Sequence, residues 1–199
     1  MMMNILNVLC SKFNSNNFES EVFETAHAAA LRVIELSKGK TVGFGNSMTI
    51  NSLNLVALLK PEVKQLFIHL PGKAGKEERD ALTADLFLTS ANAVSIDGHI
   101  VNIDGTGNRV AATCFGPGRV IYLIGKNKIT ENLPAALVRA KETAVNLAKH
   151  YNRKTPCVKT GKCEECQSPG CVCAVTTIHR RKPNGLNISV FLINEELGL

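Results

Sequence analysis

In the stretch Thr41-Val42-Gly43-Phe44-Gly45-Asn46-Ser47-Met48-Thr49, a short apolar run gives way to a helix start, and this change decides the fold. The first four residues have the pattern of a buried strand. Ser47 or Thr49 suits the start of a helix that continues to Leu59 and ends before Pro61. A strand followed at once by a helix is the repeating unit of proteins built on a parallel sheet. The stretch therefore predicts an α/β fold.

The same alternation extends to both sides of this stretch. Upstream, apolar side chains recur at helical spacing over 18–36, with Asn17 as the N-cap. Downstream, apolar runs at 66–70 and 85–89 predict strands, and the polar stretch 75–82 between them predicts a helix. Strand and helix thus alternate over the first 90 residues. This order predicts a mainly parallel sheet covered by helices.

The pattern changes beyond this region. Asp97-Gly98 separates two strand-like runs, 93–96 and 99–103, and this dipeptide is a strong signal of a β-hairpin. The remaining chain is predicted to form a strand over 120–124, an amphipathic helix over 133–151, an irregular cysteine-rich cofactor loop over 152–173, and strands over 174–179 and 187–193. No repeat or linker interrupts the chain. We therefore expect residues 1–199 to form one domain, with residues 1–16 poorly ordered.

The composition is that of a globular protein and argues against several other classes. Apolar residues make up 45% and charged residues 20% of the chain, which is too apolar for a disordered protein. The net charge of +6 is dispersed except at 180–182, so nucleic-acid binding is not expected. No run approaches the ~20 apolar residues of a membrane helix. Residues 1–10 lack the basic start of a signal peptide, so we expect a cytoplasmic protein without a membrane span.

Five of the seven cysteines lie in one short segment, in the pattern Cys157-x5-Cys163-x2-Cys166-x4-Cys171-x-Cys173. A Cys-x2-Cys pair brings two thiolates to one centre from a single turn, and further thiolates nearby complete a four-ligand site. Disulfides are disfavoured in a reducing compartment, and densely packed free thiols would be open to oxidation. The segment therefore predicts a metal or iron–sulfur site, whose negative charge nearby lysines would soften.

The bound group is either an iron–sulfur cluster or zinc. Zinc ribbons bring two Cys-x2-Cys pairs together from separate hairpins. This chain has one such pair, and all its candidate ligands lie in one loop. That arrangement favours a [4Fe–4S] cluster over zinc.

Three loops that follow predicted strands carry glycines or polar side chains. The carboxyl ends of parallel strands meet at one edge of a sheet, where glycine turns and helix N-termini can accept an anion. Arg109 would pair with a carboxylate through two hydrogen bonds, and the backbone N–H groups of 45–47 would take another anionic group. A purely structural alternative has Ser47 as a helix cap and Arg109 exposed. The candidate ligand-binding residues are Gly43, Gly45, Asn46, Ser47, Thr89, Ser90, Asn92, Asp104, Gly105, Gly107, Asn108 and Arg109.

These segments together resemble the LUD-domain family of lactate-utilisation proteins. The similarity covers residues 20–199 and runs through 41–49, Ala84-Asp85-Leu86-Phe87-Leu88-Thr89-Ser90-Ala91-Asn92-Ala93, Val101-Asn102-Ile103-Asp104-Gly105-Thr106-Gly107-Asn108-Arg109-Val110-Ala111-Ala112, 125–129, Thr155-Pro156-Cys157 and Thr160-Gly161-Lys162-Cys163. It implies a Rossmann-like α/β layer like that of ribose-phosphate isomerase and the CoA transferases. We therefore expect a mainly parallel sheet with helices on both faces, in which the β-hairpin is an insertion and the cysteine-rich loop lies toward the C-terminus.

The resemblance also implies the metal ligands. The cysteine-bearing branch of the family matches at Cys157, Cys163, Cys166 and Cys173, which leaves Cys171 as an addition. The glutamate nucleophile of the CoA transferases has no counterpart after the 85–89 strand. That analogy therefore supplies no mechanism.

The implied function is a component of a lactate-oxidising system that converts lactate to pyruvate. The cluster would relay electrons with iron–sulfur and oxidoreductase partner proteins, and the pocket at the strand ends would bind a small organic anion. Whether the chain catalyses a reaction alone stays open. One alternative is an enzyme acting on a phosphorylated or CoA-linked metabolite, with a structural metal site. Another is a zinc-stabilised interaction module.

Overall fold

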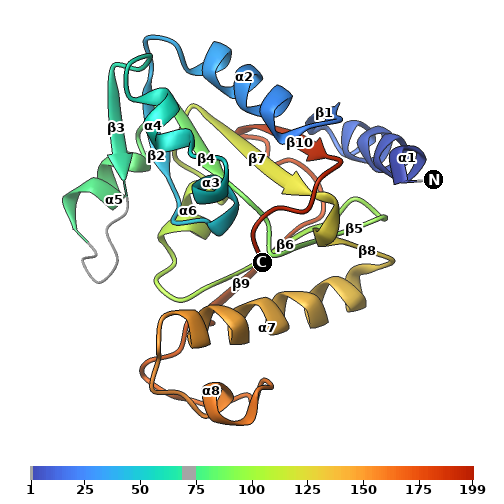
Figure 1. The fold of residues 1–199 in the computed structure, drawn as a ribbon, viewed down its shortest axis with the longest axis vertical. Helices are drawn as coiled ribbons and strands as arrows, with labels where there is room; N and C mark the ends of the chain where they lie inside the picture. The colour runs from blue at the N-terminus through green and yellow to red at the C-terminus, as the bar shows by residue number, and fades with distance from the viewer. Residues whose placement is uncertain (1, 69–74) are drawn as a thin grey trace.

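A six-stranded sheet forms the centre of the molecule, with strand order β1-β10-β7-β4-β2-β3 (Figure 1). Its strands are β1 (Glu19–Phe23), β2 (Thr41–Phe44), β3 (Gln65–Ile68), β4 (Leu86–Thr89), β7 (Arg119–Gly125) and β10 (Asn187–Ile193). All neighbouring strands run parallel. The computed structural model describes residues 2–68 and 75–199. It confirms the predicted Rossmann-like α/β fold.

Helices cover both faces of this sheet. One face packs against α1 (Met2–Ser15), α5 (Lys76–Ala81) and α6 (Asn108–Cys114), and the other against α2 (Ala26–Ser37), α3 (Met48–Ser52) and α4 (Leu55–Leu59). Successive strand residues point to opposite faces. In β7, Tyr122 is buried on the first face, whereas Ile121 and Leu123 are buried on the second. The central strands therefore bury apolar side chains on both faces, as expected for a covered parallel sheet.

A second, four-stranded sheet lies beside the first, with order β8-β5-β6-β9. Its strands are β5 (Ala93–Ser95), β6 (Ile100–Asp104), β8 (Ile129–Thr130) and β9 (Val175–His179). The predicted hairpin is confirmed, because β5 and β6 are antiparallel. The long helix α7 (Leu133–His150) packs Ala136, Ala140 and Ala144 on this sheet. The sequence predicted the hairpin but not the sheet, since β9 pairs with β6 from a distant part of the chain.

The N-terminal segment differs from the prediction. Residues 2–15 form helix α1 and are not the poorly ordered segment expected for 1–16. The reason is burial: Leu6, Leu9 and Phe13 recur at helical spacing and are fully buried against the first face of the sheet.

The helix predicted over 18–36 is also partly wrong. Its first part is the edge strand β1, which pairs with β10, and α2 begins at Ala26 after the N-cap Thr25. The partner strand lies near the other end of the sequence, so local spacing could not reveal it. The expected helix 47–59 is divided into α3 and α4 at Asn54, which has a φ of 50°.

Other boundaries follow the prediction closely. Strand β3 covers the first part of the predicted 66–70 strand, and His69 and Leu70 lie outside the described residues. The cysteine-rich loop contains the short helix α8 (Pro156–Thr160).

Within the part of the chain that the structure describes, no helix combines the length and apolarity required to cross a bilayer.

Candidate functional site

The cysteine-rich segment surrounds a cavity of about 210 Å³ that it shares with α7 and β9. All five of its cysteines line this cavity: Cys157, Cys163, Cys166, Cys171 and Cys173. The opposite wall is built by Ala144, Val145 and Ala148 of α7. The fold therefore gathers around one space the sulfurs that the sequence spreads over 17 residues.

The sulfurs are close enough to influence each other. The pKa of Cys173 is raised to about 11, first by burial and then by the neighbouring Cys171, Cys163 and Cys166. The cysteines are free thiols. Among the residues described, no three potential ligands are arranged to hold one metal ion. The sulfurs thus share a cavity without converging on a single point.

The donor set and the space fit an iron–sulfur cluster. A cavity needs roughly 10–15 Å³ to hold one water molecule, so this one is large for a single ion. Zinc draws its four ligands to within about 2.3 Å of one centre. An iron–sulfur cluster spreads cysteine ligands over several iron atoms. Cys157, Cys163, Cys166 and Cys173 would hold such a group, and Cys171 also reaches the cavity.

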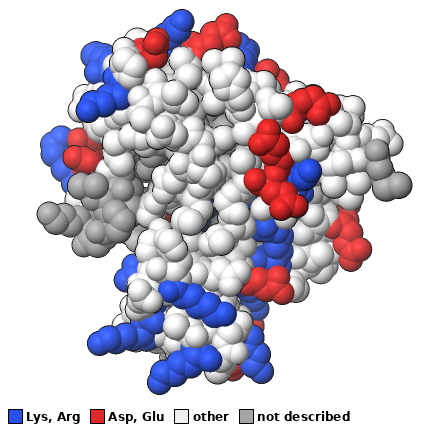
Figure 2. Space-filling model, viewed as in Figure 1, with Lys and Arg blue, Asp and Glu red and all other residues white. Residues whose placement is uncertain are grey.

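Basic side chains surround the outer end of this loop. Figure 2 shows Lys and Arg side chains gathered at the end of the molecule where α8 lies. The exposed members on this segment are Arg153, Lys154, Lys159 and Lys162. A centre bound by four thiolates carries negative charge, which these cations would offset.

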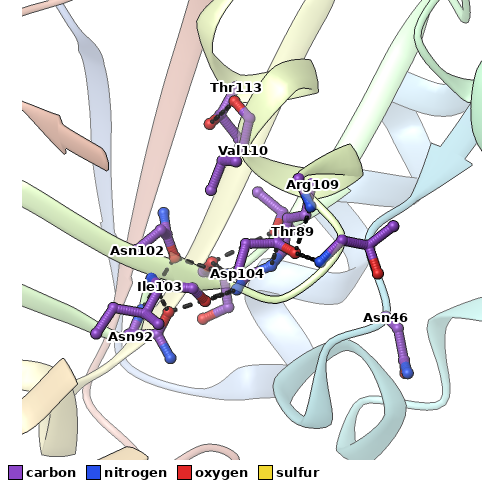
Figure 3. Close-up of polar contacts among 12 residues, drawn as sticks. Asn46, Thr89, Asn92, Asn102, Ile103, Asp104, Arg109, Val110 and Thr113 are labelled. Carbon is purple, nitrogen blue, oxygen red and sulfur yellow. Dashed lines mark hydrogen bonds and ion pairs between the residues drawn. The ribbon is translucent and has the colours of Figure 1, made fainter. Parts of the chain in front are cut away.

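A network of polar side chains lies at the ends of β4 and β6, with Arg109 at its centre (Figure 3). Arg109 comes from the first turn of α6. Its Nη1 donates to Asn102 Oδ1 at 2.7 Å, and its Nη2 donates to the carbonyl of Ile103 at 2.6 Å. Longer contacts of 3.5 Å reach the Ser90 carbonyl and Asn92 Oδ1. The protein's own acceptors therefore engage both terminal nitrogens of the guanidinium.

Asp104 is the counter-charge of Arg109. Its Oδ2 lies 3.5 Å from Arg109 Nε, and the two side chains are only 8% and 13% exposed. Its Oδ1 accepts hydrogen bonds of 3.0 Å from the backbone N–H groups of Thr106 and Gly107. The pairing of Arg109 with a ligand carboxylate stays a prediction, and in the fold its donors contact the protein's own acceptors. Arg109 fixes the turn after β6 against the strand ends.

The same turn joins the network to the cysteine loop. A Cβ placed on Gly105 would lie 2.9 Å from Val172 Cα, so glycine is required for this close approach. Ile103 lines the cysteine cavity while its carbonyl accepts from Arg109. The two regions therefore share β6 directly.

A small polar cavity of about 40 Å³ lies beside the network. Five of the predicted ligand-binding residues line it: Asn46, Ser47, Ser90, Asn92 and Arg109. They come from the loops after β2, β4 and β6, so the predicted convergence of strand ends occurs here. Thr143 and Leu147 of α7 close the cavity. Ala144, the residue after Thr143, lines the cysteine cavity instead. The two cavities are therefore neighbours along α7.

The predicted glycines of the first loop serve packing. A Cβ on Gly43 would lie 2.8 Å from Ala81 Cβ, so glycine allows α5 to approach β2. Gly45 accommodates the side chain of Arg109 at a similar distance, and its N–H donates to the Leu88 carbonyl at 3.3 Å. The N–H of Gly45 is therefore engaged by the neighbouring strand, and anion binding by the backbone N–H groups of 45–47 stays a prediction.

The remaining predicted residues do not line the small cavity. Thr89 is buried at the end of β4. Asp104, Gly105, Gly107 and Asn108 form the turn into α6. Gly107 has a φ of 89°, a conformation that favours glycine, and precedes the first residue of the helix.

Lys128 lines the small cavity, and the sequence analysis missed it. It ends the 3₁₀ helix η1 (Lys126–Lys128) after β7 and is only 4% exposed. Its Nζ donates to Thr49 Oγ1 at 2.7 Å, to Ser90 Oγ at 2.9 Å and to the Ala91 carbonyl at 3.1 Å. All three acceptors are neutral. Within the described chain, Lys128 forms no ion pair.

Burial has a large effect on this amine. It lowers the pKa of Lys128 from 10.5 to about 7, with smaller contributions from the charges of Arg139 and Arg109. A signal for Lys128 was present in the sequence, because it follows the predicted strand 120–124 just as Asn46 and Ser90 follow theirs. Because the carboxyl ends of parallel strands meet at one edge of the sheet, Lys128 could have been included among the predicted site residues.

Comparison with known proteins gives a family and a fold. A family model described as the LUD domain matches residues 6–193. The structure resembles the crystal structure of a DUF162 family protein from Deinococcus radiodurans, with a TM-score of 0.55 and 13% sequence identity, covering 97% of this chain and 98% of that chain. Similarity at this identity concerns the fold alone. No curated protein is close enough in sequence to count as a match.

Proposed function

This chain belongs to the LUD-domain family, which is associated with lactate utilisation, and from that premise we propose that it is an electron-transfer component of lactate oxidation. In this proposal Cys157, Cys163, Cys166 and Cys173 hold a [4Fe–4S] cluster. The small polar cavity binds an organic anion of the pathway. The partners are iron–sulfur and oxidoreductase proteins that exchange electrons with the cluster.

One observation carries the proposal: cysteines spread over a long loop line a single cavity whose size suits a polynuclear group. When bound, an iron–sulfur cluster supplies one-electron transfer. The chain's own residues hold that group near the surface, because Cys163 and Cys173 are exposed. A partner can therefore approach the sulfurs closely.

The relation of the two cavities supports a joint role. Residues of α7 line both cavities, and the Gly105 turn lies against Val172 of the cysteine loop. An anion in the small cavity would sit beside the wall of the cysteine cavity. This neighbourhood is what a protein needs if ligand binding and electron transfer are to be linked.

Cysteine variants of anaerobically purified protein test the proposal. The wild type should show a broad absorption band near ~400 nm that bleaches on reduction. Cys163→Ser and Cys166→Ser should lose this band. Cys171→Ser, a matched change in the same loop, and Cys114→Ser, outside it, should keep the band.

Two outcomes would overturn the proposal in different directions. A colourless protein with stoichiometric zinc would support the zinc-stabilised interaction module. A coloured centre that never responds to reductant or oxidant would support an enzyme with a structural metal site. In either case electron transfer by this chain is rejected.

A further inference from the structure

The small cavity contains the ammonium group of Lys128, which forms no ion pair with a carboxylate side chain among the described residues. Lys128 is 4% exposed, and its three hydrogen-bond acceptors are two hydroxyls and a carbonyl. Neutral acceptors satisfy the N–H groups of an ammonium but do not neutralise its charge. A buried cation in this situation is destabilising unless an anion approaches it.

Neighbouring charges increase this imbalance. Arg109 also lines the cavity, but Asp104 is its counter-charge. Arg139 of α7 adds a positive charge near Lys128. The charge of Glu142 acts on Arg139, but among the described residues Arg139 forms no ion pair. The side chains around the cavity therefore carry an excess of positive charge, and Lys128 is the buried group among them.

The size and lining of the cavity restrict the anion. About 40 Å³ is room for only a few water-sized atoms, since each needs roughly 10–15 Å³. A single carboxylate fits such a space. The amide and hydroxyl groups of Asn92 and Ser47 on the same wall suit an oxygen on the carbon next to the carboxylate.

We propose that Lys128 is the cation that recognises the carboxylate of a small 2-hydroxy or 2-oxo acid in this cavity. The choice of these acids rests on the proposed function, whereas the role of Lys128 rests on the geometry. The ligand oxygen would replace the longest hydrogen bond of Nζ, the 3.1 Å contact to the Ala91 carbonyl. Arg109 then acts as a positioning residue that holds the cavity wall.

Calorimetric titration of the full, anaerobically purified chain with pyruvate and with lactate tests this inference. Lys128→Met should weaken binding about tenfold or more, because a charge-assisted hydrogen bond is lost. Lys126→Met is the matched control: it removes the same charge from the same 3₁₀ helix, but the residue lies outside the cavity. It should change the affinity by less than about twofold.

The wild type provides a second measurement that does not depend on a variant. The ligand carboxylate stays ionised above pH 6, since such groups have pKa values of roughly 3.3–3.7. The other charged side chains that act on Lys128 are Arg139 and Arg109. Affinity should therefore fall between about pH 7 and pH 9 as Lys128 loses its proton, by up to about tenfold per pH unit.

Equal affinity in Lys128→Met and the wild type would overturn the inference. So would binding of inorganic phosphate with no binding of either monocarboxylate, or an affinity that does not change over this pH range. These outcomes leave the cluster untouched, because its absorption is measured separately. Absence of the chromophore together with Lys128-dependent binding would instead reject the proposed electron transfer and keep this inference.

Discussion

The polar network around Arg109 and the cysteine loop are neighbours. They differ in how many of their polar groups find hydrogen-bond or charge partners within the folded chain. In the network, short hydrogen bonds and the Asp104 carboxylate engage the guanidinium. In the loop, five thiols line a cavity, and Cys157 has a close polar contact, 3.1 Å from Thr155 Oγ1. The pKa of Cys173 is raised by burial and by the adjacent sulfurs, so thiolates are disfavoured there in the absence of a cation.

This difference distinguishes residues that build a site from residues that await a ligand. Arg109 has the residue type and the location of an anion receptor, but the fold uses it to fix a turn. Lys128 and the cysteines are the groups whose chemistry the fold leaves incomplete. Substitutions in the network should therefore change stability, whereas changes in the loop and at Lys128 should change ligand or metal binding.

Removing Arg109 should destabilise the whole domain. Arg109→Ala leaves the Asp104 carboxylate buried without its counter-charge, and breaking such a pair lowers the free energy of unfolding by about 3–5 kcal/mol. Urea denaturation measures the change. Arg180→Ala, at an exposed position, should stay within about 0.5 kcal/mol of the wild type. An unchanged midpoint for Arg109→Ala would mean that the network does not stabilise the fold.

Lys128 should give stability a specific pH dependence. Its pKa is about 7 in the folded protein and about 10.4 when unfolded, so between these values the unfolded state holds one more proton. The free energy of unfolding of the wild type, relative to Lys128→Met, should therefore rise by about 1.4 kcal/mol per pH unit above pH 7. Below pH 7 the difference should be constant. Denaturation curves at several pH values check this, and parallel profiles throughout would contradict it.

Removal of the bound group should loosen the cysteine loop and little else. Because few hydrogen bonds tie the loop to the fold, the stripped protein should be cut by trypsin after Lys159 and Lys162, which are exposed. Its circular dichroism spectrum should match that of the loaded protein, since both sheets are complete without the loop. Equal resistance of the two forms to trypsin would show that the loop is held without a bound group.

The basic side chains at the outer end of the cysteine loop should have the smallest effect, a shift of the reduction potential of the bound centre. Replacing Lys159 and Lys162 by glutamine removes positive charge near the centre and should lower its reduction potential, because adding an electron becomes less favourable. The substitution should not change the amount of bound metal. Lys60→Gln, an exposed change at the end of another helix, should leave the potential unaltered. A raised potential in the double variant would contradict the electrostatic role of these two lysines.

The sequence predicted those features that depend on local patterns. The continuous apolar run of β4 and the Asp97-Gly98 turn are recognisable without a structure, and so is the spacing of the cysteines. Strand β1 could not be recognised, because its partner β10 is near the other end of the chain. Two acceptors of Arg109, the Ser90 carbonyl and Asn92 Oδ1, were hidden for a similar reason, since they follow β4, whereas Asn102 and Ile103 lie on the strand just before Arg109. The role of Lys128 depends on burial, which no local pattern records.

Iron and acid-labile sulfide analysis of anaerobically purified protein shows whether the loop cysteines share one inorganic centre. Sulfurs that await a shared inorganic centre predict about four iron atoms and four sulfides per chain. They also predict that both are lost from the Cys166→Ser variant. One zinc per chain without sulfide, or cysteines of the loop that all react as independent thiols, would contradict the account.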